Sequence, residues 1–464
     1  MLVARGQTLV VGLGVSGRAI ARHLVREGAS FTVADTRKIP PGLDEFRNEF
    51  PQVRVHCGPL SEIDLESFEE IVLSPGVDPR SPGLESFWER SRQQGSALSI
   101  VGEIALFTRA CSAPIAAITG SNAKSTVTTL LGEMAHEVGL NAAVGGNLGT
   151  PALDLLHAQP DAELFVLELS SFQLETTPCL GATTAAFLNL SEDHLDRHGD
   201  MAGYRAAKLG IFRGAKHVVV NAEDNMTWPD DKDLPVDCFT IKPPQGPQWG
   251  IAVHDDGGGK APWLMHGSRP LMAVDELRLP GRHNQANVLA ALAMGTRLGF
   301  PLEAMRRVLA RFPGLPHRGQ LVGAVDGVRW VNDSKGTNVG ATLAAIDGLG
   351  ATLEGKLIWL GGGVGKGADF TPLAEPLARH AREAIVFGAD APRLVESLSP
   401  SVPVVRKDSL EQALERAASI ARPGDCVLLS PACASLDQFA NYMARGEAFC
   451  EWVERHLEFR EKGA

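Results

Sequence analysis

The chain has 464 residues, of which 44% are hydrophobic and 21% charged, a composition typical of a soluble globular protein with about three domains. Its formal net charge of −11 argues against nonspecific binding to DNA or to anionic membranes. No apolar run of about 18 residues predicts a membrane span, and seven widely spaced cysteines without a CxxC pair indicate reduced cytosolic thiols instead of disulfides or a zinc site.

The first segment predicts strands that alternate with helices. The apolar start of the chain is short and broken by glycines, which favours a first strand over residues 8–11 and not a signal peptide. A helix over 18–27 and strands over 31–34 and 70–73 follow. This alternation predicts a parallel, doubly wound sheet, whose ligands bind beyond the carboxyl ends of the strands.

The turn Gly12-x-Gly14-x-x-Gly17 follows the first strand, and Asp35 lies 18 residues later at the end of the second. This is the dinucleotide fingerprint in its usual context. Three interpretations remain open: an NAD site, a tight turn alone, or a site for the diphosphate of a UDP-sugar, because a helix N-terminus recognises phosphate and not nicotinamide.

The second segment opens with a phosphate loop. The sequence I-A-A-I-T-G-S-N-A-K-S-T predicts a buried strand, a turn, and a helix that begins near Lys124. The lysine would offset the β/γ-phosphate charge, and a Ser or Thr hydroxyl would ligate Mg²⁺. A Ser/Thr-rich helix cap is the alternative. Ala123 stands where the pattern has glycine, which costs about 1 kcal/mol or more if that residue needs a positive φ.

Further elements follow in the second segment. A strand over 164–169 carries Glu168, which is well placed to hold Mg²⁺. A strand over 187–189 precedes a polar run with His194, and a helix over 204–212 carries Lys208; neither residue is informative alone. Residues 242–268 read as a loop or hairpin, and 285–298 as an Ala-rich helix.

The break at 313–316, P-G-L-P, precedes a third alternating pattern. Strands are predicted over 329–331, 357–360, 384–387 and 426–429, and helices over 339–347, 373–382 and 410–421. The third segment therefore predicts a further α/β sheet.

Ten motifs in order make the chain resemble the Mur ligase family of cell-wall amino-acid ligases. They are G-S-N-A-K-S-T, G-G-N-L-G, L-E-L-S-S-F-Q-L-E, N-L-S-E-D-H-L-D-R-H, Y-R-A-A-K-L-G-I-F, G-R-H-N-x-x-N, G-L-P-H-R, N-D-S-K-G-T-N, G-G-G-V-G-K-G-A-D-F and L-S-P-A-C-A-S-L-D-Q-F. The D-T-R and S-P-G turns and the S-L-D-Q-F segment most resemble the members that add D-glutamate to UDP-N-acetylmuramoyl-L-alanine.

The resemblance implies three α/β domains: a Rossmann-like UDP-substrate domain over 1–103, a P-loop-type ATP domain over 104–314, and a Rossmann-like amino-acid domain over 315–464. The UDP-substrate would contact Gly14, Val15, Ser16, Gly17, Asp35, Thr36, Arg37, Ser74, Gly76 and Asn147. ATP would contact Gly120, Ser121, Asn122, Ala123, Lys124, Ser125, Thr126, Asn287, Arg318 and Asp333. D-glutamate would contact Thr337, Lys366, Ser435, Leu436 and Tyr442, the last a position where the family often has Phe.

The implied reaction joins two substrates at the expense of ATP. ATP would phosphorylate the L-alanine carboxylate, and the D-glutamate amine would displace phosphate from the acyl phosphate. Two Mg²⁺ ions are implied, with Ser125, Glu168, His194 and a carbamate on Lys208 as ligands, and Lys124, His194 and Lys208 as the catalytic set. The base that deprotonates the amine is His194 or His317, and the sequence leaves this open. A cytoplasmic monomer without a nucleic-acid partner is expected.

Three other functions compete with this one. The first is a related ligase, either folylpolyglutamate synthase or a Mur ligase for another amino acid. The second is a nicotinamide-dependent oxidoreductase, which the second phosphate loop disfavours. The third is an inactive nucleotide-binding regulator, against which the set Lys124, Glu168, His194 and Lys208 argues.

Overall fold

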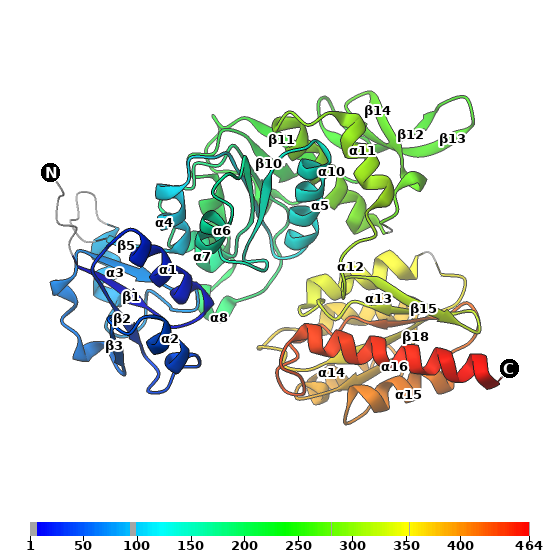
Figure 1. The fold of residues 1–464 in the computed structure, drawn as a ribbon. Helices are drawn as coiled ribbons and strands as arrows, with labels where there is room; N and C mark the ends of the chain where they lie inside the picture. Colours follow the sequence, from blue (N-terminus) through cyan, green and yellow to red (C-terminus); the bar gives the residue numbers. More distant parts are fainter. Residues whose placement is uncertain (1–6, 93–98, 280, 352, 464) are drawn as a thin grey trace. The chain divides into compact units, whose positions relative to one another are not determined.

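The computed structural model describes residues 7–92, 99–279, 281–351 and 353–463. It contains three sheets, coloured from blue through green to red along the chain in Figure 1. The chain divides into two compact units: the first holds residues 1–190, 194–276 and 287–310, and the second holds the remainder. None of the helices in the described ranges has the length and hydrophobicity of a membrane span.

The first sheet has five parallel strands in the order β3-β2-β1-β4-β5. In that order the strands are Arg54–Cys57, Phe31–Asp35, Thr8–Val11, Glu70–Leu73 and Ser99–Gly102. The helices are α1 (Val15–Arg26), α2 (Leu43–Glu49), α3 (Glu85–Ser91) and α4 (Glu103–Ala110). The strand order reverses between β1 and β4, the type of position where doubly wound sheets bind ligands.

The second sheet has nine strands in the order β14-β13-β12-β11-β10-β9-β6-β8-β7. In that order they are Arg269–Ala273, Lys260–His266, Trp249–Asp255, Val236–Phe239, Val218–Asn221, Thr184–Phe187, Ile115–Thr119, Leu164–Glu168 and Ala142–Gly146. The helices are α5 (Lys124–Glu137), α6 (Ala152–Ala158), α7 (Ser171–Glu175), α8 (Leu195–His198), α9 (Met201–Leu209), α10 (Arg282–Arg297) and α11 (Leu302–Arg311). β12 and β13 are antiparallel and form the hairpin that was one of the two predictions for residues 242–268.

The third sheet has six strands in the order β15-β16-β20-β17-β18-β19, of which only the β15–β16 pair is antiparallel. In that order they are Gln320–Val325, Val328–Asn332, Cys426–Leu429, Leu357–Gly362, Ala381–Phe387 and Val404–Arg406. The helices are α12 (Val339–Gly350), α13 (Ala374–His380), α14 (Ala391–Leu398), α15 (Leu410–Ile420) and α16 (Tyr442–Gly463). The three-sheet α/β class predicted from the sequence is therefore confirmed.

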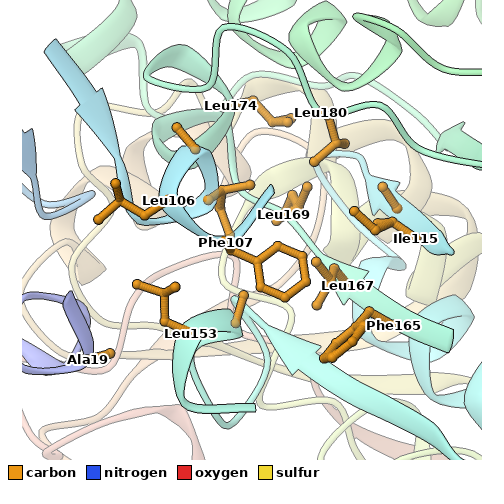
Figure 2. Close-up of a cluster of buried hydrophobic side chains, with 14 of the residues drawn as sticks. Ala19, Leu106, Phe107, Ile115, Leu153, Phe165, Leu167, Leu169, Leu174 and Leu180 are labelled. Atoms are coloured by element: carbon orange, nitrogen blue, oxygen red, sulfur yellow. The ribbon is translucent and has the colours of Figure 1, made fainter. Parts of the chain in front are cut away.

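Three hydrophobic cores show how the strands are buried. In the first unit α4 packs on the second sheet, where the Phe107 ring meets the Phe165 ring edge-on at 5.1 Å between centroids (Figure 2). In the third sheet Leu357 and Trp359 face one core, and Ile358 and Leu360 face the other. Both faces of β17 are covered, which explains its unbroken apolar sequence.

Several predicted boundaries differ from the structure by a few residues, and three of them have a clear physical reason. α1 begins at Val15 and not at residue 18, because the glycine turn itself forms the first helical turn. β9 ends at Phe187, and Leu188 and Asn189 leave the sheet. The helix predicted over 373–382 ends at His380, since Arg382 belongs to β18, where its guanidinium bonds Asp425 at 2.9 Å.

Candidate active site

The first sheet gathers the three predicted UDP-substrate turns at one edge. They follow β1, β2 and β4, which are neighbours in the order β2-β1-β4, so the segments 14–17, 35–37 and 74–76 lie side by side. A Cβ on Gly17 would lie 1.8 Å from the Gly12 carbonyl oxygen, so the close turn requires glycine there. Gly14 caps α1, whose N-terminal amide groups are a ready site for phosphate.

Asp35 is engaged by the chain itself. Its carboxylate accepts hydrogen bonds from the Leu13 amide at 2.9 Å and from the Arg37 guanidinium at 2.8 and 2.7 Å. Burial opposes ionisation, but these hydrogen bonds hold the pKa of Asp35 below its ordinary value. Asp35 therefore fixes the glycine turn, whereas Thr36 and Arg37 are exposed at the edge. Ser74 is buried, and Gly76 beyond it is exposed.

The phosphate loop joins β6 to α5. The Lys124 ammonium donates to the carbonyl oxygens of Gly120 at 2.8 Å and Ser121 at 3.0 Å, so it lies inside the loop. Asn189, just beyond β9, supports the same loop: its side-chain oxygen accepts from the Asn122 amide at 2.8 Å. Because β9 ends at Phe187, Asn189 lies outside the sheet and its side chain bonds the phosphate loop. The sequence did not indicate this contact.

Ala123 adopts a left-handed conformation with φ of +68°. An alanine in that region costs about 1–2 kcal/mol. The cost that was predicted for Ala123 if the loop needs a positive φ therefore applies. The loop keeps its form because neighbouring hydrogen bonds and the start of α5 hold it.

Ala123→Gly should stabilise the protein by about 0.5–1 kcal/mol, because relief of strain exceeds the entropy that glycine adds to the unfolded chain. Chemical denaturation followed by fluorescence measures this. Ala206→Gly is the matched control, since Ala206 is exposed within α9 and glycine there should destabilise by about 1 kcal/mol. A loss of stability in Ala123→Gly would contradict the strain argument.

Oxygen ligands lie beside the loop. The Ser125 hydroxyl donates to Glu168 Oε2 at 2.5 Å, and the Asn147 amide donates to Glu168 Oε1 at 2.7 Å. Glu168 ends β8 and is 3% exposed. Asn147 follows β7, which neighbours β8. Hydroxyl and carboxylate oxygens are the donors that Mg²⁺ prefers, so these residues fit the predicted metal.

Lys208 lies beneath the phosphate loop. It is 1% exposed, and its ammonium donates to the Gly120 carbonyl oxygen at 2.8 Å and to Thr119 Oγ1 at 3.4 Å. The ammonium also lies 4.8 Å from the centre of the Tyr204 ring. As an ammonium it cannot bind a cation. Among the described residues, no three or more His, Cys, Asp or Glu side chains form a group able to hold a metal ion.

A group of aromatic rings connects His194 to this region. His194 caps α8 with φ of +55°, and its ring lies 4.9 Å from the Phe172 ring and 6.4 Å from the Tyr204 ring. His198 stacks on Tyr204 at 5.3 Å, and burial lowers its pKa to about 4. The Tyr204 hydroxyl receives a hydrogen bond from Ser121 at 3.3 Å. Tyr204 thus touches both the loop and Lys208, a role that no sequence signal indicated.

The third sheet carries the residues that were predicted to bind D-glutamate. Thr337 follows β16, Ser435 follows β20 and Lys366 follows β17, and these strands are neighbours in the order β16-β20-β17. Ser435 is 3% exposed, whereas the side chain of Lys366 is 42% exposed and that of Leu436 is also exposed. Tyr442 begins α16.

Polar residues of the predicted ATP set are divided between the units. Asn287 is buried on α10 in the first unit, and Arg318 and Asp333 belong to the second. Burial raises the pKa of Asp333 to about 6, although hydrogen bonding by Ser430 at 2.6 Å and the charge of Arg318 oppose the rise.

His317 is held in a defined state. It has φ of +61°, and its Nδ1 lies 2.9 Å from the Asn332 amide nitrogen. Burial lowers the pKa of His317, which favours the neutral form of the ring that can accept a proton.

Comparison with known proteins gives family matches over most of the chain. The matching models are "Mur ligase MurD-like, N-terminal domain" over residues 6–93, "Mur ligase middle domain" over 118–295 and "Mur ligase, glutamate ligase domain" over 317–433. The chain is 66% identical to the UDP-N-acetylmuramoylalanine–D-glutamate ligase of Chromohalobacter salexigens, covering 97% of this chain and 98% of that one. It is 50% identical to the enzyme of that name from Pseudomonas aeruginosa, covering 96% and 97%.

Solved structures share the fold at low identity. The UDP-N-acetylmuramate-alanine ligase of Thermotoga maritima matches with a TM-score of 0.58 at 18% identity, covering 97% of this chain and 99% of that one. The MurF ligase of the same organism, solved in complex with ADP, matches with a TM-score of 0.57 at 17% identity, covering 99% and 96%.

Proposed function

The chain belongs to the Mur ligase family, and from this premise we propose that it is an ATP-dependent ligase that adds D-glutamate to UDP-N-acetylmuramoyl-L-alanine in peptidoglycan precursor synthesis. The observation that carries the proposal is 66% identity, over 97% of the chain, to an enzyme named for those two substrates. The domain limits 1–103, 104–314 and 315–464, and the assignment to a cytoplasmic monomer, are part of the same proposal.

The first half of the reaction would activate a carboxylate. A carboxylate is a poor acyl donor, so ATP transfers its γ-phosphoryl group to the L-alanine carboxylate and leaves as ADP. Such a transfer depends mainly on positioning and on charge stabilisation. In this chain the amide groups at the start of α5 and the Lys124 ammonium would hold the phosphates.

Mg²⁺ supplies charge neutralisation for the phosphoryl group when it is bound. Ser125 and Glu168 would hold the first ion, because a hydroxyl and a carboxylate lie side by side next to the loop. His194 and Lys208 would serve the second. A neutral Lys208 amine would attack CO₂, form an N–C bond and release a proton, and the resulting carbamate oxygens are hard ligands of the kind Mg²⁺ takes.

The second half would form the amide bond. The D-glutamate amine, once neutral, attacks the acyl phosphate carbon, and inorganic phosphate leaves. The carboxylates of D-glutamate would bind Thr337, Lys366 and Ser435, because the strand order brings the loops of these residues to one edge of the sheet. Leu436 and Tyr442 would complete the site. The lowered pKa of His317 favours the neutral form that a base needs, and His194 is the other candidate.

An ADP-release assay with UDP-N-acetylmuramoyl-L-alanine tests the function directly. D-glutamate should support turnover, and L-glutamate should not. Turnover with another amino acid in place of D-glutamate would indicate a different ligase of the family. Binding of NADH with no ADP release would instead support the oxidoreductase alternative.

Lys366→Ala should raise the Michaelis constant for D-glutamate roughly 10- to 100-fold, since a charge-assisted contact with a carboxylate is lost. The constants for ATP and the UDP-substrate should change much less. Lys356→Ala is the matched control, because Lys356 is exposed just before β17, at the opposite end of that strand. An unchanged D-glutamate constant in Lys366→Ala would remove Lys366 from the amino-acid site.

A further inference from the structure

Arg445 is a fully buried arginine in the second unit. It is 0% exposed and lies in the first turn of α16, where a positive charge is disfavoured by the helix dipole. Burial lowers its pKa to about 10, so it is still charged near neutral pH. A buried cation at the unfavourable end of a helix is costly, and its hydrogen bonds show what offsets that cost.

The guanidinium of Arg445 bonds three separate strand-end loops, the one after β17 through Gly362, the last residue of that strand. Nε donates to Ser334 Oγ at 3.0 Å, and Nη2 donates to the Ser334 carbonyl oxygen at 2.9 Å. Nη1 donates to the Gly362 carbonyl oxygen at 3.2 Å, and Nη2 also donates to the Cys433 carbonyl oxygen at 3.1 Å. All four acceptors are neutral, and three of them are backbone oxygens.

Each of these loops carries one of the residues assigned to D-glutamate. Ser334 precedes Thr337 by three positions, Gly362 precedes Lys366 by four, and Cys433 precedes Ser435 by two. The loops come from β16, β17 and β20, which lie far apart in the sequence. A single side chain, that of Arg445, thus bonds all three loops.

The packing around Arg445 leaves its position little freedom. A Cβ on Gly363 would lie 2.1 Å from the Ala434 carbonyl oxygen and 3.3 Å from Arg445 Nη1. The loops also meet directly, because the Val364 and Ala434 backbones exchange hydrogen bonds at 2.8 and 2.9 Å. The Ser334 hydroxyl donates to the Tyr442 carbonyl oxygen at 2.8 Å, which ties the start of α16 to the same centre.

We propose that Arg445 is the positioning residue of the amino-acid site, which fixes the spacing of Thr337, Lys366 and Ser435 through the three loops it bonds. This inference rests on the proposed function, because that function assigns the three residues to D-glutamate. Arg445 itself would not touch the substrate. Its loss should therefore misplace the residues that bind D-glutamate, while the phosphate loop and the UDP turns, which belong to the first unit, stay in place.

The test compares Arg445→Met and Arg445→Lys with wild type in steady-state ADP release, with each substrate varied in turn. The methionine variant should raise the D-glutamate Michaelis constant by about 10-fold or more, with the ATP and UDP-substrate constants within about 2-fold. The lysine variant keeps the charge and the aliphatic stem but lacks the fork of donors. Its D-glutamate Michaelis constant should therefore lie between those of wild type and Arg445→Met. Arg416→Met is the matched control: Arg416 bonds Glu383 at 2.9 and 2.8 Å in the same unit, and its loss should leave the D-glutamate constant unchanged.

The outcomes separate the two claims. If wild type turns over D-glutamate and the D-glutamate Michaelis constant is unchanged in Arg445→Met, the positioning role is overturned. The proposed function is then unaffected. An equal rise of all three Michaelis constants also overturns it, because that is general loosening. If wild type releases no ADP with D-glutamate, the function itself fails. Thermal unfolding identifies a variant that does not fold, and if Arg445→Met is one, Arg445→Lys decides by the same criterion.

Discussion

Lys124→Ala should reduce the rate of ADP release on the order of 10³-fold, while binding of the UDP-substrate stays within about 2-fold of wild type. The Lys124 ammonium lies inside the phosphate loop, bonded to the Gly120 and Ser121 carbonyl oxygens. Its removal takes away the cation that would offset the β/γ-phosphate charge. The UDP turns, in contrast, lie at the edge of a different sheet.

Calorimetry with each ligand separately, alongside the ADP-release assay, measures both parts of this prediction. Lys216→Ala is the matched control, since Lys216 is an exposed lysine of the same sheet region and its loss should change neither quantity. If Lys124→Ala weakens ATP and the UDP-substrate together, the two ligands share a single phosphate site, and the assignment of separate sites is wrong.

Lys208→Ala should be nearly inactive, and acetate should restore part of the activity. Lys208 is 1% exposed directly beneath the phosphate loop, where its ammonium donates to the Gly120 carbonyl oxygen and to Thr119 Oγ1. If the working form is a carbamate, the alanine variant lacks an anionic oxygen ligand for Mg²⁺, and a small carboxylate can occupy the space that is left.

Two controls accompany this prediction. Acetate should not restore Lys124→Ala, because that variant lacks a cation and not an anionic ligand. Wild type exposed to ¹³C-labelled CO₂ with Mg²⁺ should give a carbamate carbonyl signal in NMR that is absent from Lys208→Ala. Absence of that signal from active wild-type enzyme would exclude the carbamate, even if Lys208→Ala is inactive.

The sequence by itself determined the class of fold and the local parts of the site. Strands such as 8–11, 70–73 and 426–429 were predicted at their observed bounds, because continuous apolar, β-branched runs between turns have few other solutions. β7, by contrast, reads A-A-V-G-G and was not predicted, since alanine and glycine carry little strand propensity. The phosphate loop was also recognisable, because its residues are consecutive and its geometry is local.

Only the tertiary structure decided which residues far apart in the sequence lie close together. The order β16-β20-β17 places the loops of Thr337, Ser435 and Lys366 together, and strand order depends on packing between segments that are far apart in the chain. The same holds for Tyr204, which contacts Ser121 and Lys208, and for Arg445. An arginine on a helix is usually solvated, so nothing in its neighbours in sequence distinguishes one that is buried and bonded to three loops. Burial is a property of the assembled fold, and it sets the role of each of these residues.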